Sequence, residues 1–131
     1  MAQKFKYRNE AEFSKAICNT LRKRGWFVQR IESGTTGRGI PDIYAISPTN
    51  QPVWLELKRE RVEIGYTSAP VYIHWRPGQQ AWLHEVAIHN QTVFTLACFD
   101  DIILQIDHKK IYKDNKVLPM HCTWIKSLKD L

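Results

Sequence analysis

Residues 39–58 read GIPDIYAISPTNQPVWLELK, and this stretch decides how the chain folds. Two apolar runs, residues 43–47 and 53–57, are separated by the loop PTNQP at positions 48–52. Short runs rich in β-branched and aromatic residues, joined by a loop of Pro and Asn, are typical of two paired strands. We therefore predict a β-hairpin over residues 43–57.

A carboxylate and an ammonium group are expected on one face of the second strand. Side chains alternate across a strand, so Glu56 and Lys58 share a face with Trp54, and the apolar residues between them point the other way. In an antiparallel hairpin the start of the first strand lies beside the end of the second, which brings Asp42 close to Glu56 and Lys58. Two carboxylates and a lysine at a strand end can bind a hard divalent cation and position a water molecule.

These residues resemble a known signature. Pro41-Asp42, followed after a gap by Glu56-Leu57-Lys58, resembles the motif of the PD-(D/E)XK nuclease superfamily. Within it, the chain is most similar to the small virus-type replication-repair nucleases (VRR-NUC) and to the archaeal and phage Holliday-junction resolvases, over roughly residues 9–100. The lead-in SGTTGRGIPD at positions 33–42 and the later QQAWL at positions 79–83 make the resemblance more specific than the motif alone.

The resemblance implies an α/β fold with a restriction-endonuclease-like αβββαβ core, in which helices flank a mixed central sheet. The 131 residues are expected to form one domain, residues 1–131, with the core at about 9–100 and a C-terminal extension at 101–131. The hydrophobic pattern predicts the same order of elements. It also indicates no membrane span and no signal peptide, which favours the cytoplasm, that of the host if the protein is viral.

The first half of the chain carries clear boundary signals. Asn9 is a predicted N-cap, with acidic residues in the first turn of a helix that runs to Arg24 and ends at Gly25. Residues 26–31 are predicted as a strand that precedes the hairpin. Residues 71–73 fit either a short edge strand or an ordered loop.

In the second half, Pro77 is predicted in the first turn of a second helix that runs to about Ala87. Residues 92–98 follow as a strand. A short helix is predicted over residues 99–106 and a strand around 111–112. Residues 124, 125 and 128 are apolar at a helical spacing. The three cysteines are widely spaced and are expected to be reduced thiols.

The resemblance assigns roles to the residues of the motif. Asp42 and Glu56 would be ligands of Mg²⁺ or Mn²⁺, and the backbone carbonyl of Leu57 would be a further ligand. Lys58 would orient or activate the attacking water and stabilise charge on the phosphate. The alternative is an exposed Glu/Lys pair on an edge strand without any catalytic role.

Relatives supply one more acidic residue from the first helix, and Glu10 is the candidate for this catalytic acid and further metal ligand. It lies on the apolar stripe of the helix, whereas Glu12 is turned away from that stripe by about 200°. Glu32, at the end of the first strand, is a third candidate. Both helical acids also suit the first turn for electrostatic reasons alone.

Gln79 matches the glutamine that virus-type replication-repair nucleases carry after the lysine motif, so it is a candidate catalytic residue. It would hold a water, a carboxylate or a phosphate oxygen. Gln80 is the alternate for this role. The other interpretation is an ordinary polar residue at the start of a helix.

DNA is the expected partner. The net charge is +6, and residues 1–38 hold nine Lys and Arg against three acids, which suits a polyanion. Candidate contacts to the DNA backbone are Thr35, Thr36, Arg38, Arg59 and Arg61, because hydroxyl and guanidinium groups reach phosphates.

The residues and the resemblance together predict a metal-dependent DNA endonuclease. The resemblance alone implies a preference for branched or Holliday-junction DNA and a homodimer. The alternatives are a nuclease for linear, nicked or flapped DNA and a non-catalytic nucleic-acid-binding module. An intact pair of carboxylates argues against a pure binder, because like charges weaken binding to phosphate when no metal is present.

Overall fold

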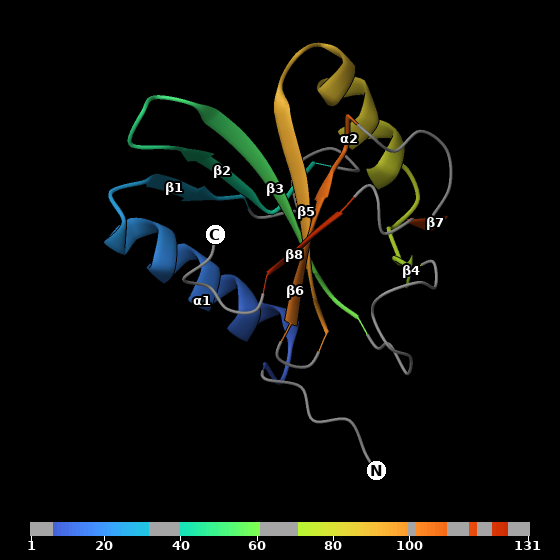
Figure 1. Ribbon diagram of the computed structural model, residues 1–131, viewed down its shortest axis with the longest axis horizontal. Helices are drawn as coiled ribbons and strands as arrows, with labels where there is room; N and C mark the ends of the chain where they lie inside the picture. Colours follow the sequence, from blue (N-terminus) through green and yellow to red (C-terminus); the bar gives the residue numbers. More distant parts are fainter. Residues whose placement is uncertain are drawn as a thin grey trace.

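The predicted hairpin forms and lies within a larger sheet (Figure 1). The computed structural model describes residues 7–31, 40–60, 71–99, 102–109, 116–117 and 122–125. Its elements, in chain order, are α1 (Glu10–Lys23), β1 (Phe27–Arg30), β2 (Ile43–Ile46), β3 (Pro52–Arg59), β4 (Val71–Tyr72), α2 (Gln79–Ile88), β5 (Thr92–Phe99), β6 (Ile102–Asp107), β7 (Lys116–Val117) and β8 (Cys122–Ile125).

The main sheet has six strands in the order β1-β2-β3-β5-β6-β8. All neighbouring strands are antiparallel except β3 and β5, which run parallel. Parallel neighbours need a long crossover, and α2 lies within this connection. The predicted α/β fold with an αβββαβ core and a mixed sheet is therefore confirmed. β4 pairs with β7 in a separate two-stranded sheet, so residues 71–72 are a strand.

The apolar side chains of α1 pack on one face of the sheet. Phe13, Ile17 and Leu21 recur at helical spacing and join Leu55 and Leu57 of β3 in one buried cluster. The alternate residues of β3 face the opposite side, where α2 lies. Figure 1 shows α1 beside β1 and α2 beside one end of β5. Neither described helix is both long and apolar enough to cross a membrane.

On the second face, Leu83 and Ala87 of α2 pack against Val93 of β5, with Trp54 of β3 and Trp82 of α2 at the margin of this cluster. The two faces of β3 thus belong to different clusters. Because period-two alternation separates them, Glu56 and Lys58 lie on the α2 face of the sheet.

The ends of α1 follow the sequence signals. The Asn9 side chain accepts a hydrogen bond of 2.8 Å from the backbone N–H of Glu12, as an N-cap does. Gly25, with φ of +86°, follows the last turn. Within the described residues, Cys18 and Cys98 are free and buried thiols.

The helix predicted over residues 99–106 is wrong, because residues 102–107 form β6. Phe99 pairs with Ile102, and β6 lies antiparallel along the otherwise open edge of β5. Isoleucine-rich runs suit a pleated surface, and the unpaired backbone groups of β5 supply the partner that periodicity does not reveal.

The helical spacing at residues 124, 125 and 128 was also misleading. Residues 124 and 125 lie in β8, which pairs with β6. Position 128 and the strand predicted around 111–112 lie outside the described residues.

The start of α2 depends on a glycine. Gly78 is the N-cap residue and has φ of +84°, a left-handed conformation. Pro77 therefore precedes the cap and does not lie in the first turn as predicted. This backbone turn sets the direction of Gln79, the first residue of the helix.

Gly78→Ala should lower the free energy of unfolding by about 1–2 kcal/mol, because a Cβ disfavours positive φ. Gly78→Asn should cost less, since Asn tolerates this conformation and the chain already holds Asn50 and Asn90 at φ of +66° and +65°. Urea unfolding of both variants tests this. Equal stability of the Ala and Asn variants would contradict the proposed backbone constraint.

Candidate active site

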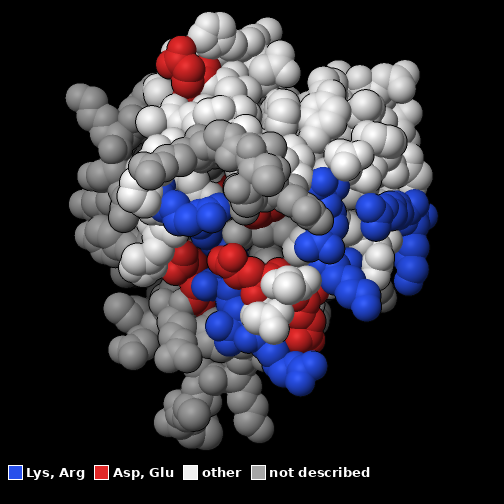
Figure 2. All heavy atoms as spheres, turned by 180° about the vertical axis from the view of Figure 1, so that it is seen from behind, with Lys and Arg blue, Asp and Glu red and all other residues white. Residues whose placement is uncertain are grey.

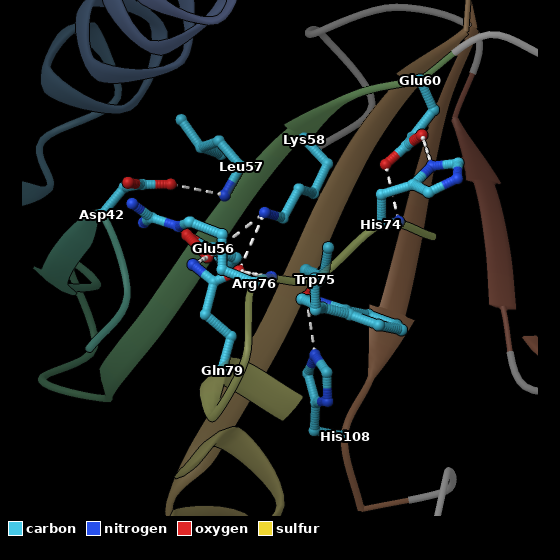
Figure 3. Close-up of polar contacts among 11 residues, drawn as sticks. Asp42, Glu56, Leu57, Lys58, Glu60, His74, Trp75, Arg76, Gln79 and His108 are labelled. Atoms are coloured by element: carbon cyan, nitrogen blue, oxygen red, sulfur yellow. Dashed lines mark hydrogen bonds and ion pairs between the residues drawn. The ribbon is translucent and has the colours of Figure 1, made fainter. Parts of the chain in front are cut away.

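Four predicted site residues meet on the α2 face of the sheet (Figure 3). Asp42 immediately precedes β2, Glu56 and Lys58 lie in β3, and Gln79 opens α2. The antiparallel register pairs Ile43 with Leu55, which places Asp42 beside Glu56. The prediction that the hairpin brings these groups together is confirmed.

Asp42 is held by both neighbouring strands. Its carbonyl oxygen accepts a hydrogen bond of 2.8 Å from the backbone N–H of Ile31, which follows β1. Its side-chain Oδ2 accepts one of 2.9 Å from the backbone N–H of Leu57 in β3. The carboxylate is half-buried, and these contacts fix its place against β3.

Gln79 joins the lysine to the glutamate. Its Oε1 accepts hydrogen bonds from Lys58 Nζ at 2.9 Å and from the backbone N–H of Arg76 at 2.7 Å, and its Nε2 donates to Glu56 Oε2. Only 1% of Gln79 and 1% of Glu56 is exposed, so water cannot replace these contacts. The described contacts place Gln79, and not Gln80, between the two charged groups.

Lys58 is buried as well, with its Nζ 4.0 Å from Glu56 Oε2. A buried ammonium needs polar partners to offset its lost hydration. The Gln79 amide supplies one, and the Glu56 carboxylate supplies an opposite charge at longer range. The alternative interpretation of an exposed Glu/Lys pair on an edge strand is therefore wrong, since β3 is an interior strand between β2 and β5.

The surroundings of Glu56 disfavour its ionised form. Burial raises its pKa to about 9, and the adjacent Asp42 carboxyl contributes in the same direction, while Lys58 and Arg76 oppose the shift. Its Oε1 is buried without a hydrogen-bond partner. Two neighbouring carboxylates repel each other when both are ionised. This pair is therefore stable only when it shares a proton or binds a cation.

The donor set fits a hard divalent cation. Asp42 and Glu56 offer carboxylate oxygens, and the partnerless Oε1 of Glu56 is an unused acceptor. Across the described ranges, no three His, Cys, Asp or Glu side chains converge closely enough to hold a metal. Asp42 and Glu56 thus form a pair, and further ligands would come from the backbone, from water or substrate, or from an acid such as Glu10 that moves closer to the pair.

The two helical acids face different surroundings. Glu10 and Asp42 line the same cavity of about 140 Å³. Ser14 and Arg30 form other parts of its wall. Glu12 pairs instead with Arg8 at 3.2 Å on the exposed surface. Glu10 is therefore the helical acid that lies on the Asp42 side. Glu32 lies outside the described residues.

Of the predicted DNA contacts, only Arg59 is described. Its Nε donates a hydrogen bond of 2.8 Å to the carbonyl of Tyr7, so part of this guanidinium is used within the chain. The remaining four, Thr35, Thr36, Arg38 and Arg61, lie outside the described residues. Figure 2 shows acidic side chains near the middle of one face with Lys and Arg side chains around them.

Sequence reasoning missed Glu60, which directly follows β3 and continues the alternation of Glu56 and Lys58. Its Oε1 accepts a hydrogen bond of 2.9 Å from the backbone N–H of His74, and its Oε2 lies 2.8 Å from His74 Nδ1. Glu60 is buried. The period of two that groups Glu56 with Lys58 could have found it, because position 60 continues the same alternation.

A second buried polar group lies on β5, beside the site. Thr95, the register partner of Glu56, accepts from Trp75 Nε1 at 3.3 Å and bonds His108 Nε2 at 2.6 Å. Burial, followed by the charge of His84, lowers the pKa of His108 to about 4, so the ring is neutral at pH 7. No local sequence pattern links these residues.

Comparison with known structures identifies the fold. The Holliday junction resolvase Hjc of the hyperthermophilic archaeon Archaeoglobus fulgidus matches 84% of this chain and 88% of its own, with a TM-score of 0.58 and 15% sequence identity. The chain therefore shares the fold of this resolvase, a mixed sheet with flanking helices. At this identity the likeness concerns the fold alone. No family model matches the chain, and a search of curated proteins finds no match.

Stability should depend on pH through Glu56. Its pKa is about 9 in the folded protein against 4.5 for an ordinary Glu, so the folded state holds the proton more tightly. The stabilisation is complete below about pH 4.5 and is lost as pH rises towards 9. In EDTA, the Tm of wild type should therefore fall between pH 5 and pH 9 relative to that of Glu56→Gln.

Glu85→Gln, which changes an exposed acid of α2, serves as the control and should follow wild type at every pH. A Tm difference between wild type and Glu56→Gln that stays constant with pH would contradict the assignment.

Proposed function

We propose that the protein is a metal-dependent DNA endonuclease that hydrolyses phosphodiester bonds and prefers branched DNA such as Holliday junctions. The observation that carries the proposal is the buried set formed by Asp42, Glu56, Lys58 and Gln79. A structural role explains it poorly, because two carboxylates in contact destabilise a fold unless a proton or cation lies between them.

Asp42 and Glu56 would hold Mg²⁺ or Mn²⁺, with the Leu57 carbonyl as a further ligand and Glu10 reaching it from the shared cavity. A metal ion at such a site offsets the charge of the phosphate and lowers the pKa of bound water. Because its pKa is raised, the Glu56 carboxyl holds a proton at neutral pH and would have to release it to bind a metal.

Lys58 would orient the attacking water and stabilise the negative charge that develops on the phosphate. Its ammonium is compact and buried, so its charge acts strongly over a short distance. Gln79 holds this ammonium and the Glu56 carboxylate in fixed relative positions through one amide. We assign Gln79 the role of aligning the lysine with the metal ligands.

The DNA substrate is supported by the net charge of +6 and by the fold shared with an archaeal Holliday junction resolvase. Thr35, Thr36, Arg38, Arg59 and Arg61 remain proposed backbone contacts, and a homodimer remains proposed by resemblance. Cleavage of linear, nicked or flapped DNA is the alternative within the same chemistry. A non-catalytic binding module is the alternative from another class.

Cleavage of a labelled four-way junction and of the matching linear duplex, each with Mg²⁺, Mn²⁺ or EDTA, tests the proposal. Wild type should cut the junction in either metal and not in EDTA. Asp42→Ala and Lys58→Ala should each slow cutting by at least about 100-fold. Glu10→Gln should also slow it, whereas Glu12→Gln should not, because Glu12 pairs with Arg8 away from the cavity.

Equal cutting of both DNAs would retain the site and reject the junction preference. Binding without cutting in either metal would reject the nuclease and favour the binding module. Cutting that survives both Asp42→Ala and Lys58→Ala would show that the active site lies elsewhere.

The two glutamines allow a matched comparison. Gln79→Met keeps the side-chain length but removes the hydrogen bonds to Lys58 and Glu56, so the single-turnover rate should fall roughly 10- to 100-fold, as expected for lost hydrogen bonds to charged groups. Gln80→Met should change the rate less than threefold. Similar losses in both variants would contradict the alignment role of Gln79.

A further inference from the structure

The segment of residues 74–78, between β4 and α2, is bonded to the sheet at several points. His74 is held through its backbone N–H and its ring by Glu60, the residue that follows β3. Trp75 donates to Thr95 of β5, and the ring of Trp75 packs edge-on against His108. These contacts fix the residues on the N-terminal side of Arg76.

Arg76 itself is fixed through its backbone. Its N–H donates to Gln79 Oε1, the same atom that accepts from Lys58. The position of Arg76 is therefore tied to that of the lysine, and bonded residues lie on both sides of it. An exposed arginine on so constrained a backbone is presented in a defined direction.

The side chain of Arg76 extends past Glu56 towards Asp42 (Figure 3). Its charge acts on the Glu56 carboxyl, lowering a pKa that burial and Asp42 raise. No described residue forms an ion pair or hydrogen bond with its guanidinium. A guanidinium thus lies beside the two carboxylates with its five N–H donors unused by described partners.

A phosphate group is a suitable partner for the Arg76 guanidinium. The planar guanidinium can bind two phosphate oxygens at once, which a lysine cannot do. Lys58 is buried and bonds Gln79, whereas Arg76 is exposed, so the two cations would meet a phosphate group from different depths.

We propose that Arg76 binds a phosphate of the DNA backbone at the active site, at or next to the bond that is cut. This inference rests on the proposed nuclease function and adds a substrate-contacting residue to it. The competing role is internal, in which Arg76 only offsets the charge of Asp42 and Glu56.

DNA binding at different salt concentrations distinguishes the two roles. Junction affinity would be measured in Mg²⁺ between 50 and 200 mM KCl for Lys58→Met, which should bind without cutting, and for Lys58→Met combined with Arg76→Ala. Loss of one phosphate contact should reduce the slope of log K against log[salt] by about 0.9.

Lys58→Met combined with Lys109→Ala is the charge-matched control and should keep the slope of Lys58→Met. Lys109 contacts Asn90, beyond the far end of the ten-residue helix α2 and about 15 Å along it from Gln79. An unchanged slope for the Arg76 variant would overturn the proposal. Circular dichroism should show an unchanged fold, because the substitution keeps the backbone N–H that bonds Gln79.

Cleavage then locates the contact. At saturating Mg²⁺, Arg76→Ala should slow single-turnover cutting by about 10- to 100-fold, and Arg76→Lys by less. The measurement is repeated on junctions that carry one neutral methylphosphonate linkage, placed in turn at each phosphate flanking the cut. At one position, most of the rate difference between wild type and Arg76→Ala should disappear. A loss that persists at every neutral linkage, or that excess Mg²⁺ abolishes, would show the internal role and overturn the proposal.

Failure of the proposed function is separable from failure of this inference. If wild type cuts no DNA in Mg²⁺ or Mn²⁺, the nuclease proposal fails. The salt slope, measured on wild type and Arg76→Ala, still decides whether Arg76 contacts phosphate.

Discussion

The contact between the Asp42 and Glu56 carboxyls is the constraint on which the site depends. Neither group can donate to the other when both are ionised, and burial denies Glu56 the water that would otherwise solvate it. The neighbouring contacts stabilise these two carboxyl groups. The Leu57 N–H bonds Asp42, the Gln79 amide bonds Glu56, and the Lys58 charge lies within 4.0 Å of the glutamate.

The cost of this arrangement falls on the stability of the metal-free protein. A buried acid that keeps its proton at neutral pH is available to exchange that proton for a cation, which an exposed glutamate of ordinary pKa does not need to do. Function and stability therefore oppose each other at Glu56, and replacing its charge should stabilise the fold while removing a proposed ligand.

The one parallel pair in the sheet explains why α2 contributes to the site. β3 and β5 run parallel, so the chain must cross the face of the sheet between them, and α2 begins beside Glu56 and Lys58. The left-handed turn at Gly78 aims Gln79 inward. The same crossover carries residues 74–76, of which His74 bonds Glu60, Trp75 bonds Thr95 and the backbone of Arg76 bonds Gln79.

Local sequence was sufficient for the hairpin, the caps of α1 and the meeting of Asp42 with Glu56. These depend on turn residues, period-two alternation and short-range antiparallel pairing. Sequence could not assign β6 and β8, because short apolar runs fit either a helical or a strand period. Pairing with β5 and β6 decided that both are strands.

Sequence also left Glu10 against Glu12 and Gln79 against Gln80 open. The tertiary structure distinguishes the members of each pair by their contacts. Glu10 shares a cavity with Asp42, whereas Glu12 pairs with Arg8 on the exposed surface. Of the two glutamines, it is Gln79 that bonds Lys58. The residue types and their spacing thus determined which chemistry the chain can hold. Only the crossover between parallel strands decided which of two adjacent side chains is buried within it, because that choice depends on contacts between segments far apart in the sequence.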